Sequence, residues 1–318
     1  MKRAVRLCVF SNFKYFCTMI FYFSGTGNSH WAATLLGKHL NERIVSISEL
    51  TETDTKFVLE KDEIVGFVFP VHGWRVPRIV SDFMQTLEFK EGDFQNKNSH
   101  YTFCLLTAGD SIGRTMERFV SELKEVKTET TLELNAVEAV IMPESYVGLP
   151  GMNVDKPEKE LEKIKSAEKV IDRFASIVDR RDFSQNNLPL GWENLKRGPI
   201  PDFFSGPVGS FFTRFLITDK PFKVESKKCI RCGICAKVCP VEDIDGGKGK
   251  TPIWKNNKKC LTCFACYHHC PSHAIEYGNR TKHKGQYFFG RREINVYVKW
   301  NRLYFSINNI TEIIRTKI

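Results

Sequence analysis

Short apolar runs alternate with longer amphipathic stretches between Met19 and about Asp182. We predict strands at the apolar runs Met19–Phe23, Arg43–Ile47, Glu63–Phe69, Tyr101–Thr107 and Ala136–Met142. Several runs are continuously apolar, as expected for a parallel sheet that is covered on both faces. The intervening pattern predicts helices over Ser29–Leu40, Pro77–Leu87, Gly113–Val126 and Pro157–Val178. This alternation predicts a doubly wound, five-stranded parallel sheet over residues 19–182.

The pattern breaks at residues 183–218, which are rich in Pro and Gly. Five phenylalanines lie there: Phe203, Phe204, Phe211, Phe212 and Phe215. We interpret this segment as a linker that packs its rings between two domains; a membrane-contacting or partner-binding patch is the alternative. A second, cysteine-rich domain is predicted at 219–280, followed by a basic tail at 281–318. In the tail, Ile294–Val298 and Leu303–Ile307 could form strands.

Residues 1–18, ahead of the first predicted strand, are basic and partly apolar. Arg6, Asn12 and Lys14 interrupt the apolar run, and no small-residue cleavage site is evident. We therefore predict neither a signal peptide nor a membrane span in this region. Residues 1–18 are expected to be a loose extension or a mis-assigned start, and the chain is expected to be cytoplasmic.

Eight of the eleven cysteines form two copies of the spacing C-x2-C-x2-C-x3-C-P. The copies comprise Cys229, Cys232, Cys235 and Cys239, and Cys260, Cys263, Cys266 and Cys270. This spacing is typical of bacterial 4Fe-4S proteins in which the fourth cysteine ligates the other cluster. One cluster is then expected on Cys229, Cys232, Cys235 and Cys270, and the other on Cys260, Cys263, Cys266 and Cys239. Zinc sites use more widely separated cysteine pairs, and disulfides require an oxidising compartment.

Two features lie near these motifs. Val241 to Lys259, between the copies, are expected to form a solvated hairpin rather than a nucleotide site, because the glycines lack phosphate-loop spacing. His268 and His269 lie between two predicted ligands. We expect them on the surface, with hydrogen bonding to sulfur as the alternative.

The formal net charge of +10 raises the possibility of a nucleic-acid partner. Eight ligating thiolates would subtract about eight charges, and two oxidised cluster cores would return about two each. The loaded protein is therefore only mildly basic, and no nucleic-acid partner is predicted. A solvated surface is the simple interpretation, and a basic docking face for an acidic redox partner is the alternative.

The loop after the first strand is Ser24, Gly25, Thr26, Gly27, Asn28 and Ser29. A glycine-containing, hydroxyl-rich turn that opens a helix offers backbone N–H groups to an anion. The loop lacks the lysine of a phosphate-binding NTPase loop and the G-x-G-x-x-G of a dinucleotide site. We therefore predict a monophosphate ligand, with a simple glycine turn as the alternative.

Two further strand ends strengthen this prediction, because ligands of open parallel sheets bind beyond the carboxyl ends of the strands. The candidates are Val71, His72, Gly73 and Trp74 after the third strand, and Thr107, Ala108, Gly109 and Asp110 after the fourth. Trp74 offers a flat ring that could stack on an isoalloxazine, with a core or rim aromatic as the alternative.

The first loop matches the T/S-x-T-G-N-T/S phosphate loop of flavodoxin at Ser24, Thr26, Gly27, Asn28 and Ser29. Residues 19–180 resemble flavodoxin, and residues 219–277 resemble a bacterial two-cluster ferredoxin. Joined in this order, the chain resembles the EFR-type ferredoxin family of flavodoxin–ferredoxin fusions. The resemblance implies bound FMN, a flavodoxin-like fold and a small α+β ferredoxin-like domain. It leaves open which ring covers the flavin.

We predict an electron carrier that relays electrons between two 4Fe-4S clusters and FMN, serving protein redox partners of unknown identity. One alternative is an FMN-dependent reductase of a small organic acceptor that the clusters feed, for which His72 is the one hint of a proton donor. Another alternative is a redox- or oxygen-sensing regulator. No general acid–base pair or nucleophile triad is evident in the sequence.

Overall fold

The computed structural model of the chain describes residues 18–51, 53–92, 100–129 and 132–291. The predicted extension therefore lies outside the described residues up to residue 17, and residue 18 already belongs to the first strand. The predicted strands Ile294–Val298 and Leu303–Ile307 also lie outside the described residues.

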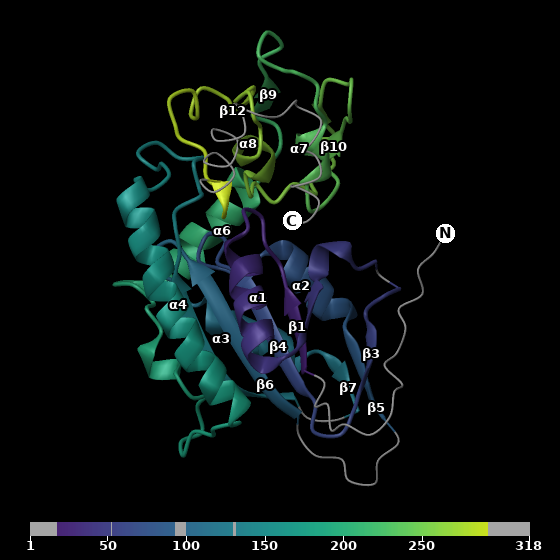
Figure 1. Ribbon diagram of the computed structural model, residues 1–318, viewed down its shortest axis with the longest axis vertical. Helices are drawn as coiled ribbons and strands as arrows, with labels where there is room; N and C mark the ends of the chain where they lie inside the picture. Colours follow the sequence, from purple (N-terminus) through teal and green to yellow (C-terminus); the bar gives the residue numbers. More distant parts are fainter. Residues whose placement is uncertain (1–17, 52, 93–99, 130–131, 292–318) are drawn as a thin grey trace, which may run out of the picture.

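A five-stranded parallel sheet in the order β2-β1-β4-β6-β8 forms the centre of the larger domain (Figure 1). The strands are β1 Thr18–Tyr22, β2 Arg43–Ser46, β4 Ile64–Pro70, β6 His100–Ala108 and β8 Leu132–Ile141. The main helices are α1 Asn28–Leu40, α2 Arg78–Thr86, α3 Thr115–Lys124 and α4 Pro157–Asp179. This order of main strands is the flavodoxin-like order, which confirms the predicted fold class.

Both faces of the sheet are buried, which explains the continuous apolar runs in the sequence. In β1, Phe21 belongs to the core cluster shared with α2 and α3, whereas Ile20 belongs to the cluster shared with α1 and α4. In β4, Phe67 and Val68 divide in the same way. Adjacent strand residues point to opposite faces, so each face requires its own apolar set.

A second parallel sheet of three short strands was not predicted from the sequence. Its order is β3-β5-β7, with β3 Lys56–Leu59, β5 Glu88–Glu91 and β7 Lys127–Thr128. These strands are two to four residues long and carry exposed charged side chains. A pattern this short and polar gives little periodic signal. Two 3-10 turns, η1 Ile47–Glu49 and η2 Trp192–Asn194, complete the larger domain.

The cysteine-rich domain lies at one end of the main sheet (Figure 1). Strand β9 Phe222–Val224 pairs antiparallel with β12 Ile275–Tyr277. The short helices are α7 Ile234–Lys237 and α8 Ala265–His268. Between the two motifs, β10 Ile244–Asp245 and β11 Ile253–Trp254 pair antiparallel, so this insertion is a hairpin as predicted.

The linker is more regular and less buried than predicted. It forms consecutive helical turns: α5 Pro201–Phe203, η3 Phe204–Val208, α6 Gly209–Phe211 and η4 Phe212–Leu216. Of its rings, Phe212 is buried, whereas Phe203, Phe211 and Phe215 are each more than half exposed. The prediction that the rings pack between the domains is therefore wrong for these three, because helical turns direct successive rings to different sides.

Among the described residues, no helix has the length and apolar character needed to span a membrane.

Candidate functional site

Four cysteines surround a small cavity in the small domain. They are Cys229, Cys232, Cys235 and Cys270, and we call them the outer quartet. Cys232 is exposed, so this cavity lies close to the surface. The turn that carries Cys229 and Cys232 continues into α7, which carries Cys235, while Cys270 follows α8.

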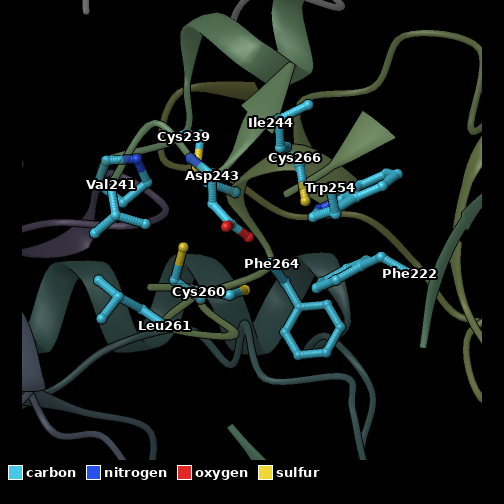
Figure 2. A pocket seen from close by; sticks show the side chains of 13 residues that line it. Phe222, Cys239, Val241, Asp243, Ile244, Trp254, Cys260, Leu261, Phe264 and Cys266 are labelled. Atoms are coloured by element: carbon cyan, nitrogen blue, oxygen red, sulfur yellow. The ribbon is translucent and has the colours of Figure 1, made fainter. Parts of the chain in front are cut away.

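A second small cavity is surrounded by Cys239, Cys260, Cys263 and Cys266, which we call the inner quartet (Figure 2). Apolar side chains form much of the remaining wall: Phe222, Val241, Ile244, Trp254, Leu261 and Phe264. The carboxyl group of Asp243 also points into this cavity (Figure 2).

Each cavity therefore combines three cysteines of one motif with the fourth cysteine of the other motif. Cys270 joins the first motif at the outer cavity, and Cys239 joins the second motif at the inner cavity. This is the grouping expected for exchanged fourth ligands. Within the described residues, no group of three or more His, Cys, Asp or Glu side chains converges closely enough to hold a single metal ion.

Backbone N–H groups are directed at sulfur in both quartets. Those of Thr262 and Asp243 donate to the sulfurs of Cys260 and Cys239, each at 3.3 Å. That of Ala274 donates to the sulfur of Cys270 at 3.2 Å. Hydrogen bonds of this kind tune the reduction potential of a bound cluster.

Burial raises the pKa of the Cys263 thiol to about 12 and that of Cys235 to about 11. Burial also raises the pKa of the thiols of Cys239, Cys260 and Cys266. Without a bound metal, these groups are protonated at neutral pH. Iron would have to displace the protons, because thiolates and not thiols are metal ligands.

The inner quartet lies directly against the loop that follows β1. A methyl group added to Gly25 would lie 2.9 Å from Cβ and 3.4 Å from Sγ of Cys263. Leu261 belongs to the core cluster of the larger domain, and Arg78 of α2 donates to the carbonyl oxygen of Cys260 at 3.4 Å. The inner cavity is therefore packed onto the carboxyl end of the main sheet.

The loop itself has an arrangement suited to an anion. Gly27 is the residue before α1, with a left-handed φ of 93°, and no side chain caps the helix. The backbone N–H of Gly27 donates to Ser24 Oγ at 3.0 Å, while Thr26 and Ser29 are buried. Since the first N–H groups of a helix have no intrahelical acceptor, an uncapped start after a glycine turn favours a bound anion.

The other two predicted loops lie beside this one. Thr107, at the end of β6, shares a 2.8 Å hydrogen bond with the hydroxyl of Ser29, and its carbonyl accepts from Val71 N–H at 2.9 Å. Ala108 is buried. Gly109 allows close approach of Glu144 from the loop after β8, because an added methyl would collide with that carboxyl group.

One salt bridge supports these loops from α4. Lys163 Nζ donates to Asp155 at 2.7 Å and to the carbonyl oxygen of Gly109 at 3.1 Å. Its hydrogen bond lowers the pKa of Asp155 against the effect of burial, whereas burial raises the pKa of Glu144. Asp110, the last residue predicted for this loop, is exposed.

Trp74 and Gly73 lie against the linker, and His72 precedes them in the same loop. Trp74 packs against Phe204 with ring centres 4.7 Å apart, and its indole N–H donates to Ser111 Oγ at 3.3 Å. Gly73 has a left-handed φ of 56° and contacts Phe212, to which an added methyl would lie within 2.6 Å. Burial lowers the pKa of His72 to about 4, so its ring is neutral at pH 7.

Sequence analysis missed a segment that covers the loop after β1. We call residues 281–291 the strap. Phe289 N–H donates to the carbonyl oxygen of Thr26 at 2.9 Å, and its ring stacks on Trp31 of α1 at 4.9 Å. The Tyr287 hydroxyl donates to Asn28 Oδ1 at 2.6 Å, and Asn28 Nδ2 donates to the carbonyl oxygen of Pro143 at 3.1 Å.

His268 of α8 links this strap to the loop after β8. It is fully buried, which corrects the expectation that it lies on the surface, and within the described part of the chain its ring bonds to backbone groups and not to sulfur. Its Nδ1 accepts from Tyr287 N–H at 3.0 Å, and its Nε2–H donates to the carbonyl oxygen of Ser145 at 2.6 Å. Burial lowers its pKa to about 3, so the ring is neutral and serves as a structural bridge.

The sequence carried little signal for the strap and Asp243. The aromatic character of 287–289 was visible, but the contact with Asn28 joins residues 259 positions apart. Asp243 follows Cys239 by four residues, and burial raises its pKa to about 6. Its position in the cavity depends on the chain turning back towards the second motif, which spacing alone does not specify.

Comparison with known proteins identifies the family of the cysteine-rich region. Residues 222–271 match the family model of the 4Fe-4S dicluster domain, which confirms the predicted iron–sulfur domain. No curated protein sequence matches the chain.

Solved structures resemble the larger domain at low similarity. They include a flavodoxin from the domain Archaea (13% identity, TM-score 0.30, covering 51% of this chain and 98% of that one). An FMN-dependent NADH-azoreductase from Bacillus anthracis shares 9% identity (TM-score 0.31, 51% and 99%). A WrbA-like flavodoxin from Agrobacterium tumefaciens shares 14% (TM-score 0.28, 52% and 99%). The fold assignment rests on the strand order and not on these scores.

Proposed function

We propose that this chain is an electron-transfer protein that relays electrons between two 4Fe-4S clusters and a bound FMN. The observation that carries the proposal is the contact between Cys263 of the inner quartet and Gly25 of the loop after β1, which leads into the uncapped start of α1. A cluster on the inner quartet and a flavin whose phosphate is bound by this loop would lie close together in one protein. Electrons could then pass between them without a separate carrier protein.

The proposed cluster ligands are the two quartets as the cavities group them. The outer quartet would hold one cluster and the inner quartet the other. The neutral thiols would lose their protons on metal binding, and the N–H groups of Asp243, Thr262 and Ala274 would then face the sulfur charge.

The residues around the sheet edge fit a flavin mononucleotide. The phosphate would accept from the first N–H groups of α1, with Ser24, Thr26 and Ser29 supplying hydroxyl groups nearby. When bound, FMN supplies chemistry in steps of one or two electrons. The loops proposed to surround its ring are Val71, His72, Gly73 and Trp74, and Thr107, Ala108, Gly109 and Asp110.

The same residues favour a carrier over a reductase. A reductase of a small organic acceptor requires a proton donor beside the acceptor. His72 was the candidate, and burial lowers its pKa to about 4, so at pH 7 its ring is neutral and a weaker proton donor than an imidazolium would be. We therefore propose protein redox partners, rather than a small organic substrate, as the source and destination of the electrons.

Anaerobic purification followed by iron, acid-labile sulfide and flavin quantification tests the proposal. Two clusters and one flavin predict about eight iron atoms, about eight sulfides and one FMN per chain. Rapid mixing with a low-potential reductant should then show cluster reduction followed by flavin reduction within the same molecule. Protein with zinc in place of iron, or flavin that is reduced no faster than in a cluster-free sample, would contradict it.

A further inference from the structure

The outer cavity has a rim that differs in charge from the inner one. Two segments meet there, residues 229–237 and 246–250, and together they contain Arg231, Lys237, Lys248 and Lys250 but no acidic residue. Arg231 and Lys250 line the outer cavity itself. All four side chains are exposed. We call these four residues the basic rim.

The fold holds these two segments together. The backbone N–H of Gly249 donates to the carbonyl oxygen of Arg231 at 2.8 Å. A methyl group added to Gly233 would lie 2.6 Å from the carbonyl carbon of Gly247 and 2.7 Å from the backbone nitrogen of Lys248. The insertion between the motifs therefore folds against the first motif and brings its lysines to the mouth of the outer cavity. Figure 1 shows α7 and β10 on the part of the small domain that is turned away from α4.

The charges of the rim are not neutralised by neighbouring acids. Among the described residues, no ion pair forms with any of the four side chains. Of the acidic residues that flank the two segments, Glu225 pairs with Lys228 at 2.8 Å, Asp245 pairs with Lys255 at 3.5 Å, and Asp243 is buried at the inner cavity. Glu242 is exposed and, within the described part of the chain, forms no ion pair with the rim. The rim thus presents an unpaired positive surface around the exposed Cys232.

We propose that the basic rim is the docking surface for a redox protein with an acidic face, which exchanges one electron with the outer cluster. This inference rests on the proposed function. In one encounter, the reduced centre of the partner loses one electron and the oxidised outer cluster gains it, or the reverse, and no bond or proton moves. Charge complementarity steers such encounters and raises the association rate, an effect that salt screens over about 8–10 Å.

The inner cavity cannot serve this purpose. Its wall is largely apolar, its acidic group is the buried Asp243, and it is packed against Gly25 and the sheet. A partner protein would have to displace the larger domain to reach it. The exposed outer rim is the side on which an external protein can approach a cysteine quartet directly.

The probe for this proposal is a purified small ferredoxin of strongly negative net charge. Its binding to the full iron-loaded chain is measured at low and high salt, together with the second-order rate of electron exchange. We expect the double variant Arg231→Glu/Lys250→Glu to weaken binding and slow exchange at least tenfold at low salt. The wild-type rate should fall as salt rises, and the rate of the variant should not.

The matched control is Lys124→Glu/Lys165→Glu, which changes the net charge equally at exposed positions on α3 and α4. It should change the binding affinity and the rate of electron exchange by less than about threefold, which is the effect expected from overall charge alone. A second rim variant, Lys237→Glu/Lys248→Glu, avoids the residues that line the cavity and should behave like the first. Equal loss in rim and control variants, or none in either, would overturn the docking surface.

Iron content separates this failure from failure of the proposed function. Wild-type protein without iron would remove the proposed function. If the wild-type protein contains iron, but its binding and electron exchange do not depend on salt and are unchanged in the rim variants, the docking surface is refuted. The proposed function would then still stand.

Discussion

The two cysteine quartets share one spacing and have different surroundings. The outer quartet has an exposed member, Cys232, and basic neighbours at its mouth. The inner quartet is walled by apolar side chains and touches Gly25 of the larger domain. Both quartets consist of four cysteines, so they differ in their surroundings and not in their ligands. One faces solvent, and the other faces the sheet edge.

The strongest way to break this comparison is to remove one ligand at a time. Cys263→Ala and Cys239→Ala should each lose about half of the iron and slow cluster-to-flavin transfer by about a hundredfold or more, because both remove the inner cluster. Cys232→Ala and Cys270→Ala should both lose the outer cluster and retain the inner one. These two variants should give the same spectrum, which differs from that of Cys263→Ala and Cys239→Ala. Electron paramagnetic resonance of the reduced variants distinguishes the two patterns.

Cys104→Ala is the matched control, since Cys104 is a buried cysteine in β6 outside both quartets. It should keep full iron content and wild-type transfer. The exchanged pairing would be wrong if Cys239→Ala instead shared its spectrum with Cys232→Ala.

A substitution at Gly25 would push the inner quartet away from the sheet edge without replacing any cysteine, and its expected effect is smaller. A methyl group at Gly25 would lie 2.9 Å from Cβ of Cys263, too close to be accommodated without movement. We expect Gly25→Ala to retain full iron content and to slow cluster-to-flavin transfer about tenfold, or about 1.4 kcal/mol in the barrier. Gly246→Ala, where an added methyl would make only ordinary contacts with Ala236 and Pro252 at 3.4 Å or more, is the control. Wild-type transfer in Gly25→Ala would mean that this contact does not matter.

The strap gives a subtler test of the same boundary. Tyr287→Phe removes the hydroxyl group that donates to Asn28 at 2.6 Å but keeps the ring. Since a hydrogen bond contributes about 1 kcal/mol, FMN affinity should fall about fivefold while iron content stays unchanged. Fluorescence titration of flavin into flavin-depleted protein measures this change.

Tyr101→Phe is the matched control for the strap. Its hydroxyl donates to the carbonyl oxygen of Asp182 at 3.0 Å, on a strand whose other end carries the proposed flavin loop. Flavin affinity should be unchanged in this variant. An equal loss in both tyrosine variants would show that the effect is one of general stability and not of the strap.

The fold could be predicted from the sequence because both faces of the sheet require apolar residues, which left continuous runs at β1, β4 and β6. The quartets could be predicted because ligand spacing is local. The small sheet β3-β5-β7 could not, since its strands are short and partly exposed. The linker was misjudged because the sequence shows how many rings it has but not the helical turns that divide them.

The site was predicted in its parts but not in its assembly. Loop residues such as Ser29 and Thr107 were expected at one edge, and the structure joins their hydroxyl groups. The bridge from His268 through Tyr287 to Asn28 was not expected. It depends on a chain reversal after the second motif, and such long-range contacts have no spacing rule. A basic docking face was an alternative in the sequence, but no residues could be assigned to it. Locating the basic rim required the packing of Gly233 against Gly247.

The smallest expected effect on transfer comes from Glu63, which precedes β4 at the end of the sheet away from both quartets. This carboxyl group is 4% exposed, and burial raises its pKa to about 7. The folded protein therefore keeps this proton more readily than the unfolded chain does, so the contribution of Glu63 to stability is largest below about pH 4.5 and is lost as pH rises through 7. Glu63→Gln cannot ionise, so at pH 8 it should unfold at a higher temperature than wild type, with a gain of at most about 3 kcal/mol, and below about pH 4 the two should nearly coincide.

Glu88→Gln is the control of opposite sign, because a hydrogen bond from Lys56 lowers the pKa of Glu88 and the substitution removes that favourable charge. It should give no gain at pH 8. Electron transfer should be unchanged in both variants. A change in the rate of transfer on replacing Glu63 would mean that the far end of the sheet is coupled to the quartets, and the difference between the inner and outer quartets could then no longer be attributed to their immediate surroundings alone.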